Sequence, residues 1–267
     1  MIRHNTPSEA PFVLLLLLSQ SISAAAGDDD RPSERRLDPL EIEAAFTYES
    51  LTNNAADWRS AYFEILKKFD PRTALYGSFR QTQRFSLSDQ EFLAGIYYPL
   101  AADLSLFSDV SMSPSHHLLP QWAAVAELQK GFAGGWVLHA AYRHIEFENA
   151  PTNLGYFLAE RYWGEFRASY TLYVSHLRGS TTTLSHRITG SWYYEENNAL
   201  NVSFSLGDEA ENVGPPRGVL TSRVAAYSVF GRHWLTDAWA CTYELLILQQ
   251  ADFYTRRGIR LGIRYRI

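Results

Sequence analysis

The sequence contains little of what stabilises or identifies most secreted domains and enzymes. A single cysteine, Cys241, among 267 residues leaves no disulfide framework and no cysteine metal site. Mean hydropathy is −0.22, and the one long apolar run lies near the start, at residues 12–18. A bundle of membrane helices is therefore excluded, because each helix needs about 20 apolar residues. The net charge of −5 argues against a nucleic-acid partner.

The first residues carry the features of a secretory signal peptide in the usual order. Arg3 and His4 precede the apolar run 12–18, and small residues follow it at 21–26. This run is too short to span a bilayer. We therefore predict a signal peptide over residues 1–26 that is cleaved after about Ala26. Residues 27–39, which are polar and charged, are predicted to form a flexible periplasmic lead-in.

From residue 40 onward, apolar and polar residues alternate. The clearest case is 256–267, where Ile, Leu or Tyr at the odd positions from 259 alternate with Arg or Gly at the even positions. An extended strand sends successive side chains to opposite faces. This segment is therefore predicted to be a strand with one apolar face and one cationic face. Similar apolar rows begin at Leu40, Trp136, Phe166, Leu200 and Trp239.

Turn residues divide the alternating rows into segments of about 10 to 13 residues. Short connections, as at 134–135, alternate with longer ones, as at 114–120 and 207–219, and 86–88 is a short exception. Barrels of the bacterial outer membrane have short periplasmic turns and longer outer loops. We therefore predict an all-β fold, an antiparallel transmembrane β-barrel over residues 40–267, with about 14 strands and 12 as the alternative. An even strand number places both termini in the periplasm.

Aromatic residues, which make up 14% of the chain, gather near the ends of these segments. Examples are 162–163, 192–194, Trp234 and Trp239, a placement typical of aromatic girdles at the membrane surfaces. A soluble β-sandwich or a periplasmic lipocalin-like barrel would also alternate. However, about 14 strands with outward Phe, Leu and Ile rows exceed what one sandwich core can bury, so a membrane barrel is favoured.

Several short motifs follow one another between about Trp58 and the end of the sequence. They are Arg80 with Arg84-Phe85, Pro120, Gly134-Gly135-Trp136-Val137-Leu138, Tyr162-Trp163-Gly164 with Phe166-Arg167, Tyr193-Tyr194, Gly207, Tyr254-Thr255-Arg256-Arg257-Gly258 and Leu261-Gly262. In order and spacing they resemble the YaiO-type family of outer-membrane β-barrel proteins. The resemblance implies an outer-membrane barrel and brings no established chemistry. Such barrels usually end in Phe, whereas this sequence ends in Ile267; insertion by the barrel-assembly machinery is still expected, because the terminal strand keeps its alternation.

No recognisable catalytic or metal site is present in the sequence. Ser175-His176 and Ser185-His186 are adjacent on predicted strands, so the side chains of each pair point to opposite faces and cannot share a proton. His116-His117 lies in a predicted loop and lacks further ligands. We predict no catalytic residues, no cofactor and no metal. A lipid- or saccharide-modifying enzyme built from distant strands stays open as the alternative.

The face predicted to line the barrel carries charges of both signs. The predicted lumen-facing residues are Glu43, Glu64, Arg80, Glu127, Arg143, Arg167, Arg187, Glu244, Arg260, Arg264 and Arg266. They either line an aqueous path and bias it toward particular solutes, or pair with one another as a network that stabilises the wall. Closure of the barrel would set the first strand beside the last. Glu43 is therefore a predicted partner of Arg260 and Arg264, and Glu244 is a second candidate.

The predicted function is that of a non-enzymatic outer-membrane protein of a Gram-negative bacterium. It is either a narrow passage for small polar or anionic solutes or a structural element of the membrane. Outer-membrane lipid and lipopolysaccharide are the expected partners of the apolar face. Asp208, Glu209 and Glu211, in the predicted loop 207–219, form either a solvated acidic loop or a site for divalent cations that bridge lipopolysaccharide.

Overall fold

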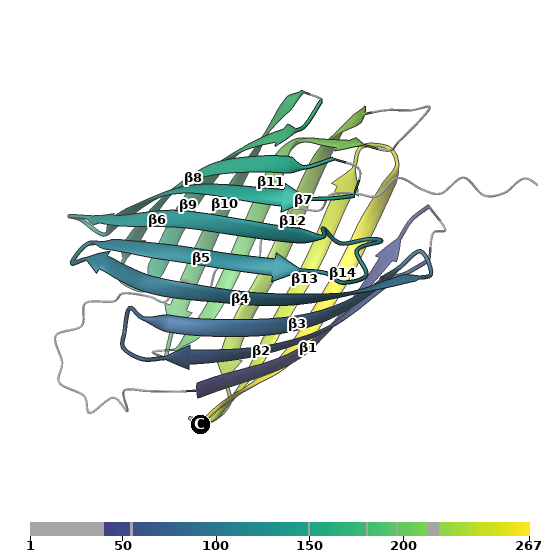
Figure 1. Ribbon diagram of the computed structural model, residues 1–267. Helices are drawn as coiled ribbons and strands as arrows, with labels where there is room; N and C mark the ends of the chain where they lie inside the picture. The colour runs from purple at the N-terminus through teal and green to yellow at the C-terminus, as the bar shows by residue number, and fades with distance from the viewer. Residues whose placement is uncertain (1–39, 54–55, 149, 180, 196, 213–218) are drawn as a thin grey trace, which may run out of the picture.

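The computed structural model describes residues 40–53, 56–148, 150–179, 181–195, 197–212 and 219–267. In this part of the chain, 14 antiparallel strands form one closed barrel (Figure 1). The strands are β1 (Leu40–Leu51), β2 (Trp58–Lys68), β3 (Ala74–Arg84), β4 (Leu87–Ala101), β5 (Leu104–Met112), β6 (Trp122–Phe132), β7 (Trp136–Glu146), β8 (Thr152–Trp163), β9 (Phe166–Leu177), β10 (Thr182–Tyr194), β11 (Asn198–Asn212), β12 (Val219–Trp234), β13 (Trp239–Gln250) and β14 (Tyr254–Arg266). The predicted fold and its count of about 14 strands are confirmed. The predicted signal peptide and lead-in lie outside the described residues, and the described part contains no helix that could cross a membrane.

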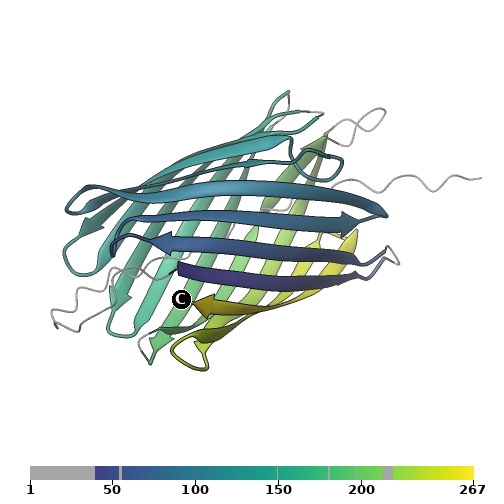
Figure 2. The same ribbon diagram turned by 60° about the horizontal axis from the view of Figure 1, so that its bottom comes forward.

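The barrel closes where β1 pairs with β14. In this register Glu43 lies opposite Arg264, while on its other side Glu43 lies opposite Glu64 of β2. The Ile267 amide donates to the Leu40 carbonyl at 2.9 Å, so pairing continues to the end of the seam. Figure 2 shows β1 and β14 side by side, with the C-terminus next to the start of β1. A sheet closed in this way has no edge strand with unpaired backbone groups.

The two faces of the barrel wall invert the usual distribution of side chains. On β14, Leu261 is 56% exposed and Ile263 is 54% exposed, whereas Arg256 and Arg264 are buried. The same contrast holds on β1, where Phe46 is exposed and Glu43 is buried. Apolar side chains outside and charged side chains inside are what a barrel wall surrounded by lipid requires.

The connections differ between the two ends of the barrel. We call the end where β1 begins and β14 finishes the terminal end, and the opposite end the loop end. At the terminal end, the predicted tight turn at Gly134-Gly135 is present, with φ angles of 78° and 76°. A Cβ on Gly135 would lie 2.3 Å from the Tyr162 carbonyl oxygen, so this turn needs glycine for both conformation and space.

At the loop end, residues 113–121 connect β5 to β6 and are held by Asp89 of β4. The fully buried Asp89 carboxylate accepts hydrogen bonds from the amides of Leu118 at 2.5 Å and Leu119 at 2.9 Å. His117 Nδ1 lies 3.0 Å from the same carboxylate. His117 thus lies in a loop, as predicted, and hydrogen bonds to Asp89 hold this loop against the barrel wall.

The expectation that Trp234 belongs to an aromatic girdle is wrong. Trp234 lies on β12 opposite the buried Ala240, on the inner face, and the Arg266 guanidinium carbon is 3.8 Å from its ring centroid. The strand period is the reason, because the neighbouring His233 takes the outward position and bonds there with the Tyr194 hydroxyl at 3.0 Å.

The predicted loop 207–219 is also wrong over its first part. β11 continues to Asn212, so Asp208 and Glu209 lie on a strand, with Asp208 opposite Arg223. Gly207 suggested a turn, but a Cβ at this position would lie 2.1 Å from the Ser185 Cβ. Close approach of β10, rather than a turn, accounts for this glycine. Residues 213–218 lie outside the described residues, and Val219, the last residue of the predicted loop, begins β12.

Candidate functional site

Charged side chains of β1, β2 and β14 meet on the inner wall at the seam. The cationic row is Arg260, Arg264 and Arg266, and the acidic side chains facing it are Glu41, Glu43 and Glu64. We call this group the seam ladder. The period-two spacing within β1 and β14 puts each row on one face, and closure of the barrel puts the two rows beside each other.

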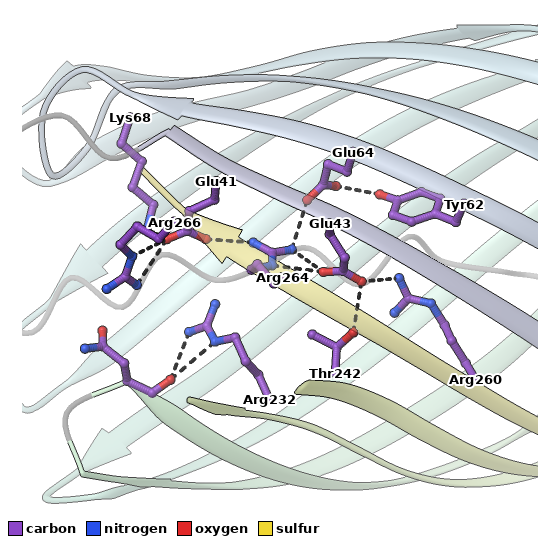
Figure 3. Close-up of polar contacts among 11 residues, drawn as sticks. Glu41, Glu43, Tyr62, Glu64, Lys68, Arg232, Thr242, Arg260, Arg264 and Arg266 are labelled. Atoms are coloured by element: carbon purple, nitrogen blue, oxygen red, sulfur yellow. Dashed lines mark hydrogen bonds and ion pairs between the residues drawn. The ribbon is translucent and has the colours of Figure 1, made fainter. Parts of the chain in front are cut away.

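Arg264 is the centre of the seam ladder (Figure 3). Its Nη2 contacts Glu43 at 2.6 Å and Glu64 at 3.0 Å, while its Nη1 contacts Glu41 at 2.8 Å. The side chain is 3% exposed, so all three ion pairs are desolvated. The fork of donors that guanidinium offers matches several carboxylates at once, whereas an ammonium would act as a point charge.

The outer members of the seam ladder are less buried. Arg260 Nη2 lies 2.6 Å from Glu43, and the Thr242 hydroxyl donates to the same carboxylate at 3.1 Å. Toward the terminal end, Arg266 Nη2 lies 3.2 Å from Glu41. Arg260 is 24% exposed and Arg266 is 27% exposed. The expected pairing of Glu43 with both Arg260 and Arg264 is therefore present in the structure.

A second charged cluster lies on β6, β7 and β8. His139 Nδ1 is 2.8 Å from Glu127, and His139 Nε2 is 3.2 Å from Glu160. Arg167 of β9 adds an ion pair to Glu160 at 3.3 Å, and the Tyr156 hydroxyl donates to Glu127. Both carboxylates and the imidazole are buried, so this histidine is enclosed between two acids.

The other predicted lumen residues are more dispersed. Arg80 forms an ion pair with Glu91 at 2.7 Å, and Arg187 Nε donates to the Ser205 hydroxyl at 3.0 Å. Arg143 lies on β7 opposite Val125 and Leu154. Glu244, the second candidate partner of the arginine row, lies opposite Arg260 in the register. The structure thus gathers Glu43, Glu64, Arg260, Arg264 and Arg266 into one site, and places Glu127 and Arg167 in another.

An aromatic and apolar group lies on the inner wall of β5, β6, β8 and β9. Its buried members are Phe107, Val125, Leu154, Tyr156 and Tyr173. Tyr76 and Tyr97 pack against it, and the Tyr97 and Phe107 ring centroids are 4.8 Å apart. Large rings on the inner face occupy space that would otherwise be open, so this group narrows the interior.

At the loop end, Trp58 is the centre of a third cluster. The guanidinium carbon of Arg84 lies 4.4 Å from its ring centroid, and that of Arg256 lies 5.1 Å away. Arg256 Nε is 3.5 Å from Glu49. We call these four residues the Trp58 cluster. These four residues, and Glu41 and His139, are not among the predicted lumen-facing residues. The strand period nevertheless places Glu41 and Glu49 on the face of Glu43, and Arg84 on the face of Arg80.

Comparison with known proteins gives the family. A model described as the YaiO membrane beta barrel domain matches residues 40–212. The chain belongs to the YaiO family of membrane β-barrels. The match begins at the first residue of β1 and ends at the last residue of β11, whereas the motifs noted above start near Trp58 and extend to the final strand. No curated protein matches the sequence significantly.

Solved structures share the fold of this YaiO barrel at low sequence identity. A bacterial polysaccharide outer membrane secretin aligns with a TM-score of 0.56 and 10% identity, over 85% of this chain and 98% of that chain. The Acinetobacter baumannii outer membrane protein Omp33 aligns with a TM-score of 0.52 and 9% identity, over 86% of this chain and 99% of that chain. At such identities the likeness shows the fold alone, which is that of outer-membrane barrels.

A cavity of about 470 Å³ lies at the terminal end of the YaiO barrel. The indole of Trp234, the guanidinium of Arg266 and the turn residues Glu195, Thr236 and Asp237 are among its lining. Arg266, the member of the seam ladder nearest the terminal end, thus borders this cavity.

The serine–histidine pairs of the YaiO barrel do not form a catalytic arrangement. His186 Nδ1 lies 2.7 Å from the Tyr170 hydroxyl, and the two rings stack. Ser185 takes the next position on β10, so its side chain points to the opposite face. His176 Nδ1 lies 3.2 Å from the Thr182 hydroxyl. Both histidines are thus partnered by hydroxyls of neighbouring strands rather than by a serine nucleophile.

Proposed function

We propose that this chain is a non-enzymatic barrel of the bacterial outer membrane that gives small polar solutes, and anions in particular, a narrow passage. The observation that carries the proposal is a set of buried nitrogen atoms on the inner wall. Nε of Arg80, Arg84 and Arg143, and all three guanidinium nitrogens of Arg256, have no hydrogen-bond partner within the described residues.

Donors that find no acceptor among the described residues call for other acceptors, such as water or a solute. Leaving a buried polar group unsatisfied costs about 1–3 kcal/mol, and more when the group is charged. Water that enters the interior would satisfy these arginines, and a path for water is also a path for small polar solutes. Among the charged groups of the described residues, the buried atoms without a hydrogen-bond partner include six arginine nitrogens of Arg80, Arg84, Arg143 and Arg256, against one carboxylate oxygen each of Glu160 and Glu209. This excess of N–H donors on cations favours anions over cations in the path.

The passage is narrow because side chains occupy much of the interior. The seam ladder lies on one wall, and the aromatic group around Phe107 lies on another. Eight-stranded barrels are filled by side chains, whereas barrels of 16 to 18 strands leave an aqueous channel. A barrel of 14 strands with these two groups inside is intermediate, so we expect a pore that excludes large solutes.

The exposed apolar band is proposed to contact outer-membrane lipid and lipopolysaccharide, after insertion by the barrel-assembly machinery. The even strand number supports a topology with both termini in the periplasm, so that the terminal end faces inward and the loop end faces outward. Cell fractionation tests the location, and recovery of the chain as a soluble periplasmic protein would contradict it.

Planar-bilayer recording of the purified, refolded chain tests the passage. We expect small, discrete conductance steps and a reversal potential in a KCl gradient that shows preference for chloride. A barrel that inserts but conducts nothing would instead support a structural role in the membrane. Conversion of labelled outer-membrane lipid by the same preparation, lost when the barrel is unfolded, would support the enzymatic alternative.

A further inference from the structure

The Trp58 cluster follows the strand register across four adjacent strands. Glu49 of β1 lies opposite Gly258 of β14, next to Arg256 on the same inner row, and also opposite Trp58 of β2. Arg84 of β3 is one position beyond Gln83, which lies opposite Arg59. The register therefore builds one continuous row of Arg256, Glu49, Trp58 and Arg84 on the inner wall near the loop end.

This row has more donors than the protein supplies acceptors for. Arg256 has no exposed surface, yet its Nη1, Nη2 and Nε find no hydrogen-bond partner among the residues that the structure describes, and its ion pair to Glu49 is long at 3.5 Å. Arg84 Nε and the indole Nε1 of Trp58, which is 1% exposed, also lack partners in the described part of the chain. Within the described residues, the atoms of Trp58, Arg84 and Arg256 that lack partners are thus all N–H donors, while Oε2 of the nearby Glu209 is an acceptor without a partner. The Glu49 carboxylate forms an ion pair with Arg256.

A ligand for this row must offer several acceptor oxygens and negative charge. The guanidinium carbons of Arg84 and Arg256 both lie within 5.1 Å of the Trp58 ring centroid, so one small ligand can reach both forks. Guanidinium binds carboxylate and phosphate oxygens through parallel hydrogen bonds. Chloride offers no such pair of oxygens. The head group of a membrane lipid cannot bind here, because the row lies on the inner face of the barrel and not on the face that contacts lipid.

We infer that the Trp58 cluster is a binding site for a small oxyanion, the carboxylate or phosphate group of a diffusible solute, at the loop end of the interior. The inference rests on the proposed passage, because the oxyanion reaches the row through the mouth of the barrel. Arg84, Arg256 and Trp58 donate to the anion, and Glu49 holds Arg256 in place and limits the site to one bound charge. Since Arg256 is fully buried, neighbouring side chains move when the anion enters.

Phe85 is positioned to take part in that movement. It occupies the β3–β4 turn with a φ of 50°, and Ser86 follows with a φ of 65°. Non-glycine residues rarely adopt such angles, and pairs of them persist only where the surroundings hold them. The Phe85 ring packs edge-on against Trp58 with centroids 5.5 Å apart, so a turn under strain covers the cluster.

The test is the unfolding temperature of the refolded full chain in detergent, measured in sodium phosphate, sodium acetate and sodium chloride at equal ionic strength. At a phosphate concentration about ten times its dissociation constant, we expect a rise of about 3 °C over chloride. Acetate at equal concentration shows whether one carboxylate suffices. Equal unfolding temperatures in all three salts would overturn the inference.

Matched variants locate the site. Arg256→Gln removes two of the unfilled donors and the charge, and should abolish the phosphate shift. Arg257→Gln changes the next residue of β14, which is exposed on the other face, and should keep the full shift. Should Arg256→Gln not refold, Arg84→Gln serves the same purpose. A phosphate shift that survives in both inner variants would overturn the inference.

Conductance separates this inference from the proposed function. If phosphate raises the unfolding temperature of a barrel that conducts no ions, the oxyanion site is supported and the proposed passage is contradicted. If the barrel conducts with preference for chloride but phosphate leaves its unfolding temperature unchanged, the passage is supported and the oxyanion site is contradicted.

Discussion

At the scale of single residues, Arg264 shows how closure of the barrel changes the role of a charged side chain. Its guanidinium contacts Glu41, Glu43 and Glu64 between 2.6 and 3.0 Å. A buried ion pair adds little stability relative to an apolar pair, but removal of one partner leaves the other charge uncompensated. Here one cation serves three acids, so its loss affects all of them.

We therefore expect Arg264→Ala to lower the free energy of unfolding by about 3 to 5 kcal/mol. Arg266→Ala should cost about 1 kcal/mol or less, because Arg266 is 27% exposed and solvent screens its pair. Urea titration of the barrel in lipid vesicles measures both. Arg257→Ala, on the outer face of the same strand, is the control. If Arg264→Ala lowered the free energy of unfolding as little as Arg266→Ala, solvent would screen the whole seam ladder.

At the scale of elements, connections and strands are specified by different features. The loop at 113–121 depends on one side chain of a distant strand, Asp89, which supplies acceptors for two loop amides. Strand orientation depends instead on alternation along the whole segment, so no single residue decides it.

Asp89→Asn should loosen the loop at 113–121. The amide side chain keeps one acceptor oxygen and loses the charge, and hydrogen bonds to charged groups contribute about 1.5–3 kcal/mol. We expect hydrogen exchange of the Leu118 and Leu119 amides to become about 10 to 100 times faster. Asp103→Asn is the control. The Asp103 carboxylate accepts a hydrogen bond from Lys130 at 2.5 Å and lies in a different connection. Unchanged exchange in Asp89→Asn would mean that other contacts hold the loop.

The two faces of β10 provide a test of orientation. Ile188 is 57% exposed on the outer face, whereas Ser185 is half-buried on the inner face beside a small cavity that Glu209 also lines. An arginine on the lipid face near mid-membrane costs about 2 to 4 kcal/mol. Ile188→Arg should therefore reduce the folded fraction after refolding into lipid vesicles far more than Ser185→Arg. Similar folded fractions would mean that the outer face of β10 is not in lipid.

At the scale of the whole molecule, the seam makes the barrel continuous, so no strand is intrinsically first or last. β1 and β14 pair along their length, and the two ends of the described chain meet at a hydrogen bond of 2.9 Å between Ile267 and Leu40. New termini are tolerated best at exposed turns.

A circular permutant should consequently fold. Residue 267 joined to residue 40 by a short linker, with new termini between Gly134 and Gly135, keeps every strand pair and both ends on the same side. We expect it to resist SDS until heated, as the parent barrel should, because all backbone groups stay paired. Electrophoretic mobility before and after heating measures this. A permutant opened within β9, between Thr171 and Leu172, should lose the resistance; if it did not, strand continuity would be dispensable.

The local properties of this protein follow from its amino-acid sequence alone. Period-two alternation on β1 and β14 specifies which side chains share a face, and glycine at 134–135 specifies a turn, because both depend only on neighbouring residues. Alternation also predicted a membrane barrel of about 14 strands, because one protein core cannot bury that many apolar rows and lipid must therefore cover them.

Which side chains meet depends on how the strands pair in the closed barrel. The seam ladder joins residues 200 or more positions apart, and the Trp58 cluster draws on four strands. These contacts depend on the register between strands and on closure, which alternation leaves open because each strand can shift by two residues and keep its faces. The predictions for Trp234 and Gly207 were wrong for the same physical reason. An indole can lie at a lipid surface or against an inner arginine, and a glycine can mark a turn or a close approach between strands. In each case only the neighbouring strand distinguishes the two alternatives.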